Sequence, residues 1–140
     1  MNYIPHIKQP KSWEELKNLM PDIADCDPRE LRLAEDELFY ELYGELVPKE
    51  IKLEILTRII GDKPVALVKN HFPYSRILQY LPNVKQYCLW SLKGDLSGDE
   101  IKKTIIEILP QKDWCQIERD VYQKSVPEIW HCHIFVNGLL

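Results

Sequence analysis

Residues 128–136, near the end of the chain, constrain the fold more than any other segment. They are rich in aromatic and β-branched residues and are followed by Asn137-Gly138, which predicts a β-strand. Successive side chains of a strand point to opposite faces. One face carries Trp130, Cys132, Ile134 and Val136, and the other carries Ile129, His131, His133 and Phe135. The first face is wholly apolar and is expected to cover a core. The second, with two imidazoles, is expected to be core or the floor of a site.

The composition favours one domain that spans residues 1–140. A chain of 140 residues with 45% hydrophobic side chains can bury a sizeable core. The net charge is −4 and no basic run stands out, so nucleic acid is not an expected partner. The sequence has no long uncharged apolar segment, so neither a membrane span nor a signal peptide is expected. Four cysteines without a C-x-x-C pair indicate reduced thiols and a cytoplasmic location.

The first 61 residues predict an extended arm and then helices. Residues 1–11 contain two prolines and little periodicity, which suggests the arm, and residues 12–61 show helical spacing of apolar side chains. Helices are expected to begin after Ser12 (a capping box with Glu15), after Asp27 and near Pro48, and to stop at Pro21, Gly44 and Gly61. Their apolar stripes are expected to serve packing.

The remainder, residues 64–140, is predicted to be rich in strands. Strands are expected over residues 65–68, 84–92, 114–122 and 128–136, with a helical turn over 75–81 and a helix over 98–109 that begins at the capping box Ser97–Glu100. Helices followed mostly by strands indicate the α+β class. We expect N-terminal helices packed on a mostly antiparallel sheet of about four strands, covered on one face.

Several short motifs occur in an order that resembles a known family. They are Ser12-Trp13-Glu14-Glu15-Leu16, Leu31-Arg32, Tyr43-Gly44, Asn70-His71-Phe72-Pro73-Tyr74, Leu89-Trp90-Ser91, Lys124-Ser125-Val126 and His131-Cys132-His133-Ile134. Together they resemble the fungal N-acetylglucosamine-induced protein family, a domain of unknown function. The chain departs from it at His71, Gln86 and Leu92, where the family has Asp, His and Lys. The segment after Tyr74 is also longer. The resemblance implies a soluble intracellular protein linked to amino-sugar response, without implying a reaction. Similar proteins in large DNA viruses make a virion-packaged role an alternative.

His131 and His133 are the candidate catalytic residues, and two chemistries fit them. Two neutral imidazoles at i and i+2 can ligate a metal if His71, Glu118 or Asp120 supplies a third ligand. The strand also resembles part of the H-x-H-x-H strand of histidine-triad phosphohydrolases, with Phe135 at the third position. The plain alternative is a pair of imidazoles hydrogen-bonded within a sheet. We predict no metal and no cofactor.

The turn after the first strand supplies further candidates for a ligand site. Asn70, His71 and Tyr74 suit a polar ring or a sugar, and Arg119 and Lys124 suit a phosphate. A packed turn and solvated charges explain the same residues. The first hypothesis is therefore a protein that binds a phosphorylated or sugar-like small molecule. Whether it also turns that molecule over is left open. The alternative is a non-enzymatic interaction or structural protein, homodimeric or packaged in a virion.

Overall fold

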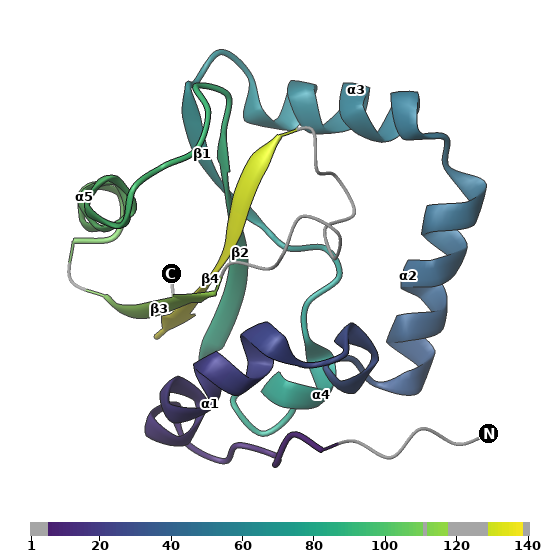
Figure 1. Ribbon diagram of the computed structural model, residues 1–140, viewed down its shortest axis with the longest axis vertical. Coiled ribbons are helices and arrows are strands. Elements are labelled where there is room, and N and C mark those ends of the chain that lie inside the picture. The colour runs from purple at the N-terminus through teal and green to yellow at the C-terminus, as the bar shows by residue number, and fades with distance from the viewer. Residues whose placement is uncertain (1–5, 111, 118–128, 139–140) are drawn as a thin grey trace.

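A computed structural model describes residues 6–110, 112–117 and 129–138. Figure 1 shows an antiparallel sheet between helices that lie on both of its faces. The strands are β1 (Val65–Lys69), β2 (Val84–Ser91), β3 (Asp113–Ile117) and β4 (Trp130–Asn137), in the spatial order β1-β2-β4-β3. The α+β class and the four antiparallel strands are confirmed. Of the strand expected over 114–122, residues 118–122 lie outside the described ranges.

Strand β4 divides its side chains between the two faces of the sheet as the alternation predicts. Its apolar face packs, together with Leu89 of β2, against helix α5 (Gly98–Ile108). Helix α5 begins at the predicted capping box, in which the Glu100 amide donates to Ser97 Oγ and the Glu100 carboxylate accepts from the Ser97 amide. The expectation that one face is covered was wrong. The β4 face that carries the histidines is covered too, because it ends in the apolar Phe135.

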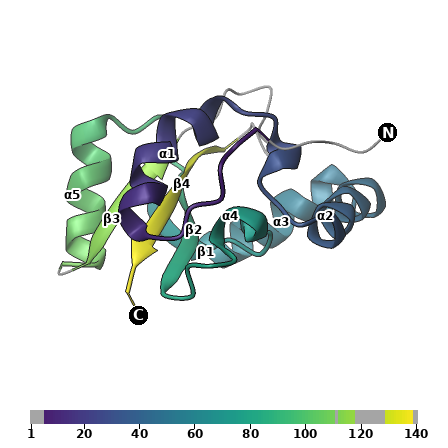
Figure 2. The same cartoon turned by 90° about the horizontal axis from the view of Figure 1, so that it is seen from below.

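Helix α1 (Trp13–Asp25) and the single turn α4 (Ser75–Leu78) lie on that second face, on the far side of the sheet from α5 (Figure 2). Their apolar side chains bury Phe135, which is 0% exposed. The predicted stop at Pro21 was wrong, since α1 continues for another turn. That turn buries Ile23 completely, and this burial offsets much of the cost of a proline inside a helix.

The arm that precedes α1 is extended over its described part and is held by a buried carboxylate. Glu30 is 3% exposed and accepts hydrogen bonds from the backbone amides of His6 and Ile7. Arg76 of α4 donates to the Ile7 carbonyl at 3.1 Å. The arm is therefore part of the packed structure, although its sequence has no periodicity.

The second predicted helix is divided into a 3₁₀ turn, η1 (Pro28–Glu30), and helix α2 (Ala34–Leu46). Asp27 caps η1 as expected, at 2.9 Å from the Arg29 amide. The chain leaves the helical path because the Leu31 carbonyl accepts from the Arg76 and Ile77 amides of α4 instead. The expected stop at Gly44 was also wrong, because glycine inside a helix has only a modest energetic cost.

Helix α3 (Lys49–Ile60) follows after a sharp corner and ends, as predicted, at Gly61, whose φ of 69° suits glycine. Leu56 and Ile60 pack on Ala66 and Trp90 of the sheet. Helix α2 has no fully buried residue, and the expectation that its stripe serves packing was wrong for Leu38, Phe39 and Leu42, which are exposed. In Figure 1, α2 and α3 form an arch over the histidine face. Within the described ranges, no helix is both long and apolar enough to span a bilayer.

Candidate functional site

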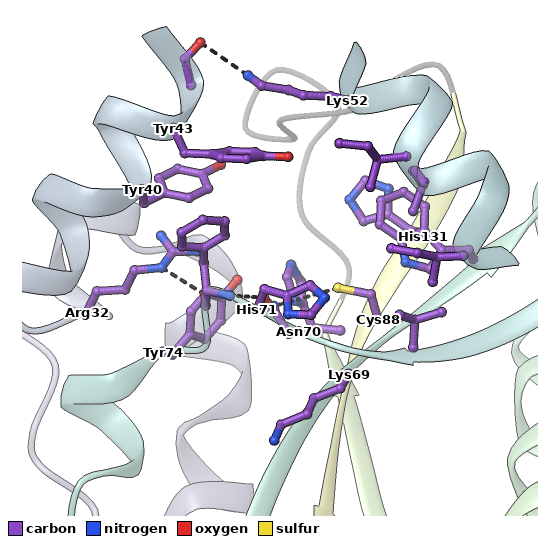
Figure 3. Close-up of a pocket in the computed structure, with 18 of the residues that line it drawn as sticks. Arg32, Tyr40, Tyr43, Lys52, Lys69, Asn70, His71, Tyr74, Cys88 and His131 are labelled. Carbon is purple, nitrogen blue, oxygen red and sulfur yellow. Dashed lines mark hydrogen bonds between the residues drawn. The ribbon is translucent and has the colours of Figure 1, made fainter. Parts of the chain in front are cut away.

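A cavity of about 380 Å³ lies between the arch of α2 and α3 and the histidine face of the sheet. Five of the predicted site residues line it: Asn70, His71, Tyr74, His131 and His133. Figure 3 shows the side chains of His131 on the sheet and of Asn70, His71 and Tyr74 in the segment after β1, opposite the tyrosines of α2. The other two predicted residues, Arg119 and Lys124, lie outside the described ranges.

His131 is placed by the register between β2 and β4. Its Cα partner is Trp90, and directly opposed residues of antiparallel strands bring their side chains together. The two rings stack with centroids 4.1 Å apart, and His131 is 5% exposed. Its Nδ1 lies 3.0 Å from the Ile129 carbonyl. Because a carbonyl only accepts, Nδ1 carries the proton, and the neutral ring has its lone pair on Nε2.

His133 has the opposite arrangement, which two side-chain amides impose. Gln86 Nε2 and Asn70 Nδ2 lie 3.1 and 3.4 Å from His133 Nδ1. The amide oxygens already accept from backbone N–H groups, Gln86 from Tyr74 at 2.7 Å and Asn70 from Phe72 at 2.8 Å. Both NH₂ groups therefore point at the imidazole. Nδ1 accepts, and the neutral ring carries its proton on Nε2.

The two imidazoles consequently offer complementary chemistry on one face of one strand. Their centroids are 6.3 Å apart. In the neutral state, His131 has its lone pair on Nε2 and His133 has its proton on Nε2. A base and a donor on one face of a strand can bind a polar group, or accept and return a proton during a reaction.

The arrangement around His133 predicts the outcome of a Gln86→Glu substitution. In the wild type, nitrogen NMR is expected to find His133 protonated on Nε2. The carboxylate of the variant places an acceptor where a donor stood, so it should raise the pKa of His133 and move a proton to Nδ1. Gln116→Glu, at an exposed position of β3, is the control and should leave both properties unchanged. A wild-type ring protonated on Nδ1 would contradict the assignment.

The segment after β1 forms the turn that holds these amides in place. Asn70 accepts from the Phe72 amide two residues on, which is the Asx turn that its sequence favours. Phe72 then packs between Tyr40 and Tyr43 of α2, with centroid distances of 5.4 and 5.2 Å. His71 is exposed at the cavity. The turn thus joins α2 to the sheet and positions Asn70 and His71.

Tyr74 closes the bottom of the cavity. It is 2% exposed, and its ring lies 5.1 Å from that of His133 and 5.9 Å from that of Phe135. It therefore forms the boundary between the cavity and the core under α1.

A buried guanidinium stands behind the aromatic wall of the cavity. Arg32 is 7% exposed and lies over the Tyr40 ring, 4.1 Å from its centroid. It donates to the Phe72 carbonyl at 2.9 Å and pairs with Glu37 at 3.2 Å. Burial raises the pKa of Glu37, and the positive charge of Arg32 acts in the opposite direction. The pair fixes α2 to the turn.

Two further polar groups line the cavity. Lys52 of α3 donates to the Gly44 carbonyl at 3.2 Å and lies over the Tyr43 ring. Its ammonium is the group best placed to meet an anion, because Arg32 is already paired. Cys88 lies beside His133, and burial raises the pKa of its thiol to about 12. The thiol is therefore neutral and unsuited to nucleophilic attack at neutral pH.

Sequence reasoning did not identify Arg32, Gln86 and Trp90 as site residues. Arg32 and Trp90 stand within two of the motifs that carry the family resemblance, and Gln86 is one of the departures from it. A signal for Gln86 was present, because it shares a strand face with Cys88 and Trp90. A polar residue on a predicted buried face needs partners, and here those partners are Tyr74 and His133.

The metal interpretation has no ligand set among the residues that the structure describes. In residues 6–110, 112–117 and 129–138, no three His, Cys, Asp or Glu side chains come together to hold an ion. Glu118 and Asp120, two of the suggested third ligands, lie outside these ranges.

Comparison with known proteins identifies a likeness of fold. No protein-family model matches the chain, and no curated protein does. The crystal structure of HTC1 is similar, with a TM-score of 0.57 and 18% sequence identity, over 91% of this chain and 85% of that chain. At this identity the likeness concerns the fold alone. The α+β arrangement described above therefore recurs, over most of its length, in a second protein.

Proposed function

We propose that this protein binds a phosphorylated or sugar-like small molecule in the cavity beside His131 and His133. The observation that carries the proposal is the convergence of these two imidazoles with Asn70, His71 and Tyr74 around one cavity of about 380 Å³. That volume is within the range of small-molecule sites, which combine apolar walls with a few placed polar groups. The same proposal has a catalytic version, in which the protein also converts the bound molecule to a product.

The chemistry of the walls supports a ring that carries polar or anionic substituents. Tyr40, Tyr43, Phe72 and Trp90 offer aromatic surface to the face of a ring. The ammonium of Lys52 suits a phosphate as a point charge. Imidazole Nε2 atoms of opposite polarity suit neighbouring hydroxyl groups, which both donate and accept.

Thermal shift and isothermal titration with nucleotide sugars and amino-sugar phosphates test the proposal. The resemblance to the N-acetylglucosamine-induced family stays a prediction, and it motivates the amino-sugar part of the panel. A ligand at about one hundred times its Kd should stabilise the protein by roughly 2.7 kcal/mol. Product analysis after incubation tests turnover. The binding proposal fails if no compound in the panel raises the melting temperature or releases heat.

Two variants and one control locate the binding site. Lys52→Gln should weaken binding of a phosphorylated compound by about tenfold and leave its uncharged analogue unaffected, as expected for one charge-assisted hydrogen bond. His133→Ala should weaken both. Lys103→Gln, an exposed lysine of α5 on the other face of the sheet, should bind as the wild type does. Equal affinity in all three variants would place the ligand elsewhere. Circular dichroism confirms that each variant is folded.

A further inference from the structure

Helix α3 lines the cavity with one charged and three aliphatic side chains. Lys52, Ile55, Leu56 and Ile59 all border it, and their spacing of three and four residues places them on one face of the helix. Lys52 lies in the first turn of α3, and Ile59 follows about 10 Å further along the axis. The face that α3 presents to the cavity is therefore cationic at Lys52 and aliphatic from Ile55 to Ile59.

The floor of the cavity also changes from polar to apolar, in this case across the strands. Val68 of β1 is the Cα partner of Cys88 on β2, and Cys88 is the partner of His133 on β4. This row of three residues spans two strand spacings, or about 10 Å. Leu56 of α3 packs on Cys88 and Val68, at the apolar end of the row. The aliphatic face of α3 and the β1 side of the sheet thus form one apolar wall.

This wall has surface that a ligand can cover. Ile55 and Ile59 are 43% and 46% exposed although they border the cavity, and Val68 is only partly buried. None of these three side chains carries a hydrogen-bonding group. An aliphatic group gains free energy by leaving water for such a wall, whereas sugar hydroxyls or the edge of a nucleobase would lose hydrogen bonds there.

The end of the wall at Lys52 suits an anion. The ammonium has three N–H donors, of which one serves the Gly44 carbonyl at 3.2 Å. Arg32, the other cation beside α2, is paired with Glu37, and Glu41 borders the cavity one helical turn after Glu37. Carboxylates therefore surround the guanidinium, and an anionic head group is favoured at Lys52 instead.

We propose that the ligand is an amphipathic phosphate ester, whose phosphate binds Lys52 and whose aliphatic group lies against Ile55, Ile59 and Val68. This proposal rests on the proposed function, because it concerns the same cavity and names the chemical class of the phosphorylated ligand. Lys52 and Ile59 are about 10 Å apart along the helix axis, so an aliphatic group of several carbons is needed to reach the far end of the wall.

Isothermal titration with methyl, butyl and hexyl phosphate tests the proposal, since these probes share one phosphate and differ only in aliphatic length. A buried methylene tightens binding by about fourfold, so two buried methylenes already make hexyl phosphate bind more than about tenfold tighter than methyl phosphate. Ile55→Gln and Ile59→Gln should each lower this ratio by at least about threefold, with the affinity for methyl phosphate unchanged. Lys52→Gln should weaken all three esters alike.

Ile51→Gln is the matched control on the same helix. Ile51 is 46% exposed and does not line the cavity, so this variant should keep the wild-type ratio. All the substituted side chains are partly or largely exposed, and equal melting temperatures show that the variants fold.

The outcomes separate this proposal from the proposed function. Equal affinity of the wild type for methyl and hexyl phosphate overturns the amphipathic class and leaves the proposed function standing, because a phosphate still binds. A ratio that survives both Ile55→Gln and Ile59→Gln, or that Ile51→Gln lowers equally, overturns the placement against α3. If no alkyl phosphate binds, the amphipathic class is overturned, and the panel of nucleotide sugars and amino-sugar phosphates decides the proposed function by itself.

Discussion

An Arg32→Met variant is expected to lose about 3 kcal/mol of unfolding free energy at pH 7, which is the scale for removing one partner of a buried ion pair. The guanidinium of Arg32 is almost fully buried, and it bonds both the Glu37 carboxylate and the Phe72 carbonyl. Methionine fills much of the same space but leaves both acceptors without that donor. Urea unfolding followed by circular dichroism gives the difference.

The same variant should show a characteristic pH dependence. Burial already raises the pKa of Glu37 above its ordinary value of 4.5, and Arg32 opposes that rise. Without Arg32 the pKa rises further. A carboxyl group with a raised folded pKa favours folding most below its unfolded pKa, and this contribution is lost as the pH rises through the folded value. The deficit of the variant should therefore be smaller at pH 4 than at pH 7.

Two further variants of the chain serve as controls for the Arg32 experiment. Arg58 forms an exposed i,i+4 pair with Glu54, so Arg58→Met should cost less than about 1 kcal/mol. Adding Glu37→Gln to Arg32→Met should recover part of the loss, because the unpaired buried charge is gone. A deficit that is equal at both pH values, or unchanged by Glu37→Gln, would show that the ion pair is not its cause.

Phe135→Ala is expected to lower the free energy of unfolding by about 3–5 kcal/mol, the usual range for truncating a buried aromatic ring. Phe135 has no exposed surface and packs among the side chains of α1 and α4. Phe135→Leu keeps most of the volume and should cost less than about 1.5 kcal/mol. A loss below about 1 kcal/mol for alanine would mean that this position is not core.

The position of Phe135 also bears on the histidine-triad interpretation. In that interpretation, residue 135 occupies the place of a third catalytic histidine. The structure instead puts Phe135 under α1, with Tyr74 between the core and the cavity. The strand therefore passes from site to core between His133 and Phe135. His131 and His133 line the cavity, and Phe135 does not.

Sequence patterns were most informative where a local rule decides the structure. The alternation over residues 128–136 predicted both faces of β4, and the pair Ser97–Glu100 predicted the start of α5. Local rules failed where distant contacts override them. Helix α1 continues past Pro21 to bury Ile23, and the break before α2 follows from the bonds between α4 and the Leu31 carbonyl. Neither cause is visible within the segment itself.

The candidate site was predictable only in its local parts. The pair His131 and His133 and the turn at Asn70 are each contained in a few consecutive residues. Gln86 and Arg32 enter through the fold, because strand register brings Gln86 beside β4 and the turn after β1 brings Arg32 to Phe72. A single sequence does not contain the register, so the partners of the imidazoles could not be identified from it.

Alternate residues of strand β4, which has eight residues, lie on two faces of the sheet that serve unrelated purposes. One face packs against α5, and the other carries the histidines. Under the proposed function, substitutions at 131 and 133 change the ligand site, whereas those at 132 and 134 change the packing against α5. A library randomised at 131 and 133 should therefore vary the ligand preference while the packing against α5 is kept. Mutational tolerance should accordingly alternate over residues 131–134 and stay low from Ile134 to Val136, where both faces of the strand are buried.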